Sequence, residues 1–218
     1  MKVVFYDGAI AIDPQALWGL HFNLPTMSMP AVKTNYISIP GRSGDLDATE
    51  IDGSIYYEDA VFELLGERLM RTTTQAREVS AAVVDALHGR RLQVRFDDEA
   101  WYYDARVFVL TYSRESLKLG VSIECRAQPY MLAVSETETA AEIAGNGEVT
   151  LQNARMPVVP TIDTTAEMTL QWGGYTATIA AGTDIVLPDL VLTEGETKIT
   201  VTGTGTITFR YRQGKLVA

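Results

Sequence analysis

Apolar and polar residues alternate with a period of two through much of this 218-residue sequence, and this pattern constrains the fold most. In residues 117–125 (LKLGVSIEC) the odd-numbered positions are apolar and the positions between them are Lys, Gly, Ser and Glu. Successive side chains of a strand point to opposite faces of a sheet, so the pattern predicts a half-buried strand. Residues 92–96 and 101–109 alternate likewise around the short segment 97–100 (DDEA), which predicts a β-hairpin.

One segment, residues 74–91, has helical periodicity instead. Thr72 and Gln75 match the spacing of a capping box at its start, and Gly89 stands where a left-handed residue ends a helix. The apolar residues at helical spacing are Ala76, Val79, Val83, Ala86 and Leu87. We expect this to be the one helix of the chain.

The second half of the chain predicts β structure throughout. Residues 135–148 are polar, acidic and rich in small side chains, so we place a domain boundary here and predict domains 1–134 and 135–218. Alternating runs flank Gly173-Gly174, and others flank Gly203-Thr204-Gly205. Both glycine pairs predict hairpin turns, and several short strands with regular turns favour a β-sandwich.

Composition excludes some classes of function. The formal net charge is −10, from 18 basic and 28 acidic residues, which disfavours a surface that binds nucleic acid. Cys125 is the single cysteine, so no intramolecular disulfide forms, and a buried strand position is favoured over a nucleophilic role. The N-terminus lacks the features of a secretory signal and no apolar run is long enough to span a bilayer, so we expect a soluble chain assembled in a cytoplasm.

No constellation of catalytic residues stands out. His21 and His88 lie far apart and form no metal-binding motif. The acids at 97–99 lie beside aromatic residues, as in some glycosidases, but adjacent acids in a turn normally face water or bind local amides. We therefore expect a protein that is not an enzyme and that has no cofactor or metal.

Residues 38–50 (SIPGRSGDLDATE) raise the question of a phosphate-binding loop. Gly41 and Gly44 are three residues apart, no lysine follows, and the acids behind them would repel phosphate. Pro40 ends the preceding strand because it lacks an N–H donor. Pro40, Gly41, Arg42 and Gly44 therefore predict a tight bend between strands, and residues 51–65 after it predict a further strand.

That bend also resembles a known family, the distal tail proteins of siphophages, which are phages with long non-contractile tails. Relatives carry Pro-Gly-Arg, a polar residue, Gly, then Leu-Asp and Thr-Glu, and this chain has PGRSGDLDATE at 40–50. Residues 87–99 (LHGRRLQVRFDDE) and 194–216 (EGETKITVTGTGTITFRYRQGKL) resemble other ordered motifs of that family. The resemblance spans nearly the whole chain.

The resemblance implies a mostly β fold: an N-terminal sandwich or barrel-like domain with one α-helix, similar to tail tube proteins, and a C-terminal galectin-like β-sandwich. It implies a hexameric ring at the tail tip of the virion, between the tail tube protein and a tail-associated lysin or tail fibre protein that serves host attachment. DNA would pass through the ring without specific binding, and six copies at −10 would carry about −60.

The bend residues have two possible roles, a structural turn or a contact between subunits. The bend residues Pro40, Gly41, Arg42 and Gly44, together with Asp47, fix a structural turn, and Arg42 pairs with a carboxylate within or between subunits or is simply solvated. Two alternatives to the hub remain. One is a carbohydrate-binding module in which Trp172 and Tyr175 stack on a glycan, and the other is a tail tube subunit.

Overall fold

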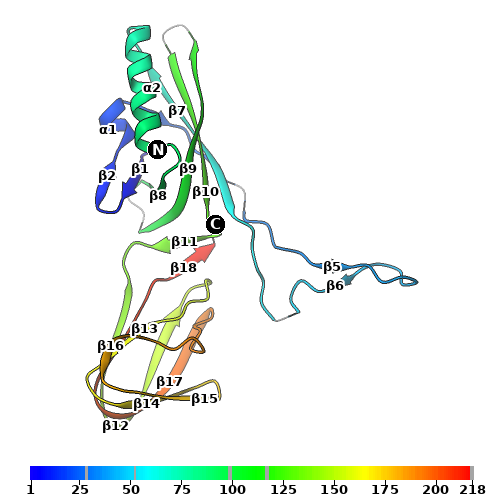
Figure 1. The fold of residues 1–218 in the computed structure, drawn as a ribbon, viewed down its shortest axis with the longest axis vertical. Coiled ribbons are helices and arrows are strands. Elements are labelled where there is room, and N and C mark those ends of the chain that lie inside the picture. Colours follow the sequence, from blue (N-terminus) through cyan, green and yellow to red (C-terminus); the bar gives the residue numbers. More distant parts are fainter. Residues whose placement is uncertain (28, 52, 98–99, 116–117, 217–218) are drawn as a thin grey trace. The chain divides into compact units, whose positions relative to one another are not determined.

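The computed structural model describes residues 1–27, 29–51, 53–97, 100–115 and 118–216 (Figure 1). Most of them lie in strands, which confirms the predicted mostly-β class. The chain divides into two units, residues 1–131 and 132–216. Neither of the helices in the described ranges is long and apolar enough to cross a membrane.

The N-terminal unit is built on one sheet with strands of different lengths. The strand order is β2-β1-β8-β9-β10-β7-β3, and β4 also pairs with β7. Every pairing along this path is antiparallel. The strands are β1 (Val3–Asp7), β2 (Ile10–Ile12), β3 (His21–Phe22), β4 (Thr26–Met27), β7 (Ala60–Leu69), β8 (Arg91–Phe96), β9 (Trp101–Glu115) and β10 (Lys118–Ala127).

The period-two prediction holds for this sheet. In β10 the residues Leu119, Val121, Ile123 and Cys125 are buried and the residues between them are more exposed. Leu117, the predicted start of this strand, lies outside the described residues. The predicted hairpin is present, because β8 pairs antiparallel with β9 in a register that places Val94 opposite Tyr103.

Helix α2 (Thr73–Leu87) packs on the core face of this sheet and ends just before Gly89, the residue predicted to stop it. The Thr72 hydroxyl caps the helix by accepting a hydrogen bond from the Gln75 amide at 3.2 Å. Gly89, at φ +75°, makes the predicted left-handed stop. The His88 ring accepts a hydrogen bond from the Val109 amide at 3.1 Å, which ties the helix end to β9.

A second helix, α1 (Pro14–Trp18), was not predicted, so the expectation of one helix is wrong. Its five residues are too few to show a helical period. Its ends are nevertheless marked: the Asp13 carboxylate accepts from the Gln15 and Ala16 amides, Pro14 opens the helix, and Gly19 closes it at φ +64°.

The C-terminal unit is a second sheet, with the order β15-β14-β17-β13-β16 and with β12 along the other edge of β17. Its strands are β12 (Thr137–Asn153), β13 (Thr161–Thr164), β14 (Met168–Trp172), β15 (Tyr175–Ile179), β16 (Gly182–Val186) and β17 (Gly195–Tyr211). Strands β11 (Tyr130–Ala133) and β18 (Gly214–Leu216) pair with each other and belong to the first sheet. The Gly173-Gly174 hairpin is confirmed, since both glycines have positive φ and Trp172 faces Tyr175 across it.

From Thr137, residues 135–148 form the first half of β12, a strand that pairs with β17 along its whole length, and the domain boundary placed there stays a prediction. One prediction for this unit is wrong. Residues 203–205 are not a hairpin turn, because β17 runs straight through them. Gly203 and Gly205 instead have φ of 151° and 147°, where a glycine can continue a strand while changing its direction.

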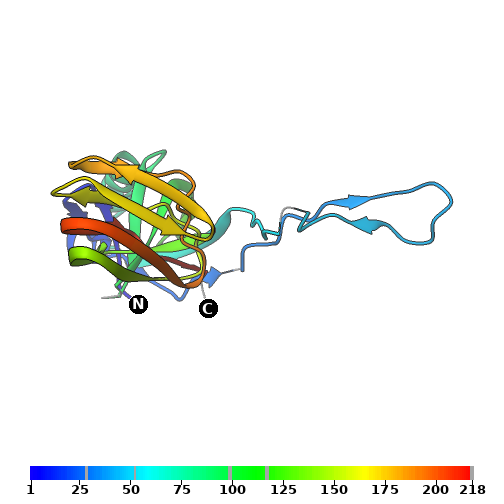
Figure 2. The same ribbon diagram turned by 90° about the horizontal axis from the view of Figure 1, so that it is seen from below.

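The inward residues of β17 all line one core, although β17 changes neighbours along its length. Residues 200–203 pair with β14, and residues 207–210 pair with β13. Gly203 ends the first of these segments and Gly205 lies between the two, so β17 can change direction there and curve around the core, as the predicted sandwich requires. The curled strands are visible in Figure 2.

Candidate functional site

The bend predicted at residues 40–44 is the tip of an exposed two-stranded segment that we call the arm, comprising the described residues of 29–58. It leaves the sheet after β4 and returns to it at β7 (Figure 1). Strands β5 (Tyr36–Ile37) and β6 (Leu46–Asp47) pair antiparallel within it. Residues 51–59, predicted as strand, contain no strand among those described, and β7 starts only at Ala60.

Backbone hydrogen bonds hold the two sides of the arm together at intervals. Near its root, Lys33 donates to the Tyr56 carbonyl at 2.8 Å and Glu58 to the Ala31 carbonyl at 2.7 Å. Farther out, the Ala48 amide donates to the Asn35 carbonyl at 2.8 Å. A two-stranded ribbon of this kind is marginally stable on its own in water.

The glycines of the tip adopt the conformation that the sequence pattern requires. Gly41 and Gly44 have φ of 82° and 77°, and the Arg42 amide donates to the Ile39 carbonyl at 3.1 Å. The Arg42 side chain is exposed and has no ion-pair partner among the residues that the structure describes. The predicted bend is therefore present, and no carboxylate among the described residues of the same subunit pairs with Arg42. A partner in another subunit stays a prediction.

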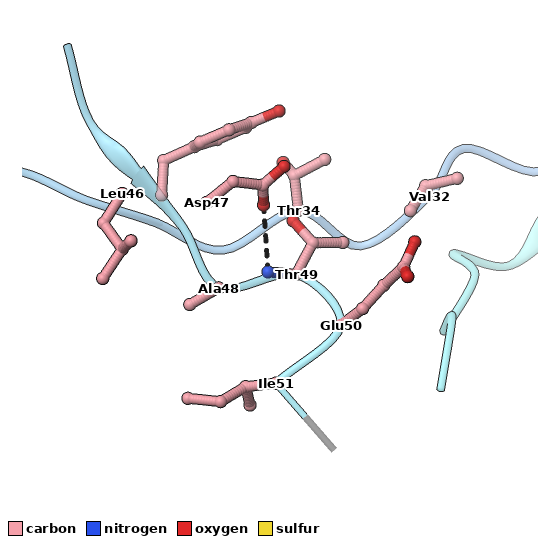
Figure 3. A pocket seen from close by; sticks show the side chains of 9 residues that line it. Val32, Thr34, Leu46, Asp47, Ala48, Thr49, Glu50 and Ile51 are labelled. Carbon is pink, nitrogen blue, oxygen red and sulfur yellow. Dashed lines mark hydrogen bonds between the residues drawn. The ribbon is translucent and has the colours of Figure 1, made fainter. Parts of the chain in front are cut away.

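Asp47 organises the turn that follows β6. Its Oδ1 accepts a hydrogen bond from the Thr49 amide at 3.0 Å (Figure 3). Hydrogen bonds from the Thr49 side chain and backbone hold the pKa of Asp47 below its ordinary value, so its carboxylate stays charged. The Thr49 hydroxyl in turn accepts from the Asn35 amide at 3.1 Å, which links both sides of the arm.

A groove of about 640 Å³ lies along this part of the arm and has mixed apolar and acidic walls (Figure 3). Its lining residues are Val32, Thr34, Tyr36, Leu46, Asp47, Ala48, Thr49, Glu50 and Ile51. Asp47 was singled out from the sequence, but its apolar neighbours were not, because their exposure depends on the absence of covering layers that a sequence pattern does not reveal.

Exposed apolar side chains are concentrated on the arm. Ile51 is 84% exposed, and Met29 and Tyr36 are each 59% exposed. The other large apolar side chains exposed there are Val32, Ile37, Ile39, Leu46, Ile55 and Tyr56. Many exposed apolar side chains on one short segment are typical of an interaction site in a soluble protein.

The second predicted site, Trp172 and Tyr175, lies at the β14–β15 hairpin of the C-terminal unit. The two rings stack with centroids 5.8 Å apart and planes 19° apart. Trp172 is 9% exposed, and its indole N–H donates to the Asp189 carbonyl at 3.3 Å. Tyr175, at 56% exposed, covers it, so Tyr175 alone offers an open aromatic face. Glycan binding here stays a prediction.

Among the described residues, no group of three or more His, Cys, Asp and Glu side chains is arranged to hold a metal ion. Asp98 and Glu99, two of the acids weighed as a catalytic cluster, lie outside the described residues. Asp97 accepts a hydrogen bond from the Lys2 amide at 2.9 Å, a local structural role.

Comparisons with known proteins identify the fold. No protein-family model matches the sequence, and no curated protein matches it. The crystal structure of the Dit protein (gp 19.1) of phage SPP1 does match, with a TM-score of 0.70 over 97% of this chain and 98% of that chain. The chain has the fold of a phage distal tail protein. Sequence identity over this distal tail fold is 17%, and the SPP1 protein is described as a paradigm of the hub adsorption apparatus in phages that infect Gram-positive bacteria.

Proposed function

We propose that this chain is a structural distal tail protein of a siphophage that forms a ring-shaped hub. The likeness to the SPP1 protein carries the proposal, because it covers 97% of one chain and 98% of the other and so includes both units. The ring is expected to be hexameric and to join the tail tube to a tail-associated lysin or receptor-binding protein. It performs no reaction and needs no cofactor or metal.

In this proposal the two domains have different tasks. Residues 1–134 build the ring around the DNA channel, and residues 135–218 project from it. The protein is assembled in the host cytoplasm and resides at the tail tip of the virion. The net charge of −10 per chain supports passage of DNA without adhesion, because a polyanion is repelled by a net negative charge.

The arm supports association between copies of the chain. A closed ring needs a heterologous contact, in which one patch of a subunit meets a different patch of the next. An extended ribbon with an exposed apolar surface gains stability when a neighbour covers it. We propose that the arm supplies one side of that contact.

Sedimentation and electron microscopy of the purified chain test this proposal. A hexamer has a mass of roughly 143 kDa, six times 23.9 kDa, and six-fold rings are the expected particles. The double variant Ile37→Asp with Leu46→Asp is expected to remain monomeric with a native circular dichroism spectrum, since both positions are exposed.

The matched control is Val186→Asp with Val191→Asp, which places the same two charges at side chains of the C-terminal unit that are 55% and 45% exposed. This variant is expected to assemble normally. A chain that stays monomeric at every concentration contradicts the hub, and assembly into long tubes instead favours a tail tube subunit.

A further inference from the structure

Three arginines stand directly opposite one another across three strands of the N-terminal sheet. Arg91 of β8 is paired with Arg106 of β9, and Arg106 is paired with Arg126 of β10. Directly paired residues of an antiparallel sheet lie on the same face with Cβ atoms about 5 Å apart, and like charges in this arrangement are destabilising. We call these three residues the arginine row.

The row is only partly neutralised within the subunit. Arg91 forms a bidentate ion pair with Asp104, in which Nη2 lies 2.7 Å from Oδ2. The Arg106 guanidinium donates a hydrogen bond to the Gly89 carbonyl at 2.7 Å. The side chain of Arg126 is exposed and forms no hydrogen bond or ion pair with another residue of the described ranges. Its guanidinium fork is therefore available to an external carboxylate or phosphate.

The surroundings of the row favour a protein over DNA. The row borders an open depression of about 270 Å³ that Asp59 and Asp104 also line, and Glu124 lies on the same face beside Arg126. These acids would repel the closely spaced phosphates of DNA. Val61, opposite Arg126 on β7, is 38% exposed, and Leu65 on the same face is 48% exposed. Apolar contact area of this kind suits a protein segment.

The chain itself contains a segment of complementary chemistry. Residues 45–51 of the arm, which we call the acidic strand, carry Asp45, Asp47 and Glu50 together with the exposed apolar residues Leu46 and Ile51. Among the described residues, the depression beside the arginine row is lined by Asp59, Phe108, Gln128 and their neighbours. The acidic strand of the same subunit does not line it.

We propose that the arginine row receives the acidic strand of a second copy of this chain. This inference rests on the proposed function, since it names the acceptor surface for the arm. The carboxylates of the acidic strand pair with Arg126 and Arg106, and Leu46 or Ile51 covers Val61 and Leu65. Because the donor and acceptor patches differ, the contact is heterologous, as a ring requires.

Disulfide trapping between copies tests the contact directly. Asp45→Cys and Arg126→Cys chains are purified separately, mixed and oxidised, and a disulfide-linked dimer is expected in the mixture but in neither chain alone. The native Cys125 does not interfere because it is fully buried. Arg77→Cys replaces Arg126→Cys as the control, because Arg77 is an exposed arginine on α2, away from this face. Equal trapping at Arg77 overturns the inference.

Charge reversal gives an independent readout by sedimentation. Arg126→Glu is expected to raise the dissociation constant for self-association at least about 10-fold, because it leaves two carboxylates facing each other. Arg77→Glu makes the same change in net charge and is expected to have no effect. Adding Asp45→Arg to Arg126→Glu is expected to restore association, since each copy then carries the exchanged pair.

The outcomes separate this inference from the proposed function. Six-fold rings that form equally well with Arg126→Glu, and no trapped dimer, overturn the arginine row as acceptor while the hub stands. A wild-type chain that never associates overturns both. Binding of duplex DNA that is lost in Arg126→Glu, without a trapped dimer, identifies the row as a nucleic-acid site and overturns the protein partner.

Discussion

Gly145 of β12 and Gly203 of β17 lie directly opposite each other in the register of the long β12–β17 pair. Both have positive φ, 93° and 151°, in the middle of long strands. On one side of this point β17 pairs with β14, and on the other side it pairs with β13. The glycine pair therefore lets two long strands curve around a single core.

Gly203→Ala is expected to destabilise the C-terminal unit by roughly 2–3 kcal/mol, because the new methyl combines backbone strain with overpacking. Its Cβ would lie 2.9 Å from the Glu167 carbonyl oxygen and 2.9 Å from the Met168 side chain. Gly145→Ala is the matched control, since its Cβ meets no atom within 4 Å and only the strain remains. Urea unfolding followed by fluorescence measures both, and equal losses would contradict the close approach at Gly203.

The free energy of unfolding is expected to fall at alkaline pH because of Cys125. Burial, with a smaller contribution from Glu124, raises the pKa of this thiol far above its ordinary value. Above about pH 9 the unfolded thiol loses its proton and the folded thiol keeps it, so the unfolded state binds fewer protons. The free energy of unfolding then falls by about 1.4 kcal/mol per pH unit.

The measurement compares wild type with Cys125→Ala in urea unfolding between about pH 8 and about pH 10. The variant lacks the thiol, so the difference in slope isolates Cys125 from other groups that titrate in this range. Identical slopes, or rapid reaction of native Cys125 with a thiol reagent, would show that the side chain is not buried as described.

Trp172→Ala and Tyr175→Ala are expected to differ in their effects on the fold. Trp172 belongs to the core and donates a hydrogen bond to the Asp189 carbonyl, so its removal costs about 3–5 kcal/mol. Tyr175 is mainly exposed, and its removal is expected to cost less than about 1 kcal/mol.

Glycan binding, measured on an array, is therefore tested by Tyr175→Ala, because a loss in Trp172→Ala would report unfolding. Retained binding in folded Tyr175→Ala would exclude stacking on this ring.

The sequence predicted those elements whose side chains alternate between core and solvent. β10 and the Gly173-Gly174 hairpin are such cases, and so is α2, with its cap at Thr72. α1 was missed because five residues are too few to show a period, although Asp13 and Pro14 carry capping signals that could have located it. The first half of β12 was not predicted as a strand, because it buries few side chains and is held by backbone pairing to β17.

The candidate site was predictable only in part. Pro40, Gly41 and Gly44 marked the bend because their backbone geometry is encoded locally. The arm and the arginine row were not predicted, because they depend on register and on which faces stay uncovered. Arg91, Arg106 and Arg126 are distant in sequence, and only the pairing of β8, β9 and β10 aligns them.

The position of this chain in the virion tests the central claim most directly. Cryo-electron microscopy of phage particles that carry an epitope tag on this chain, decorated with a tag-specific antibody, locates it in the tail. The account predicts a single site of label at the tip farthest from the capsid, in density with six-fold symmetry that accommodates the distal tail fold. Label spread along the tube, or its absence from the particle, would contradict the account.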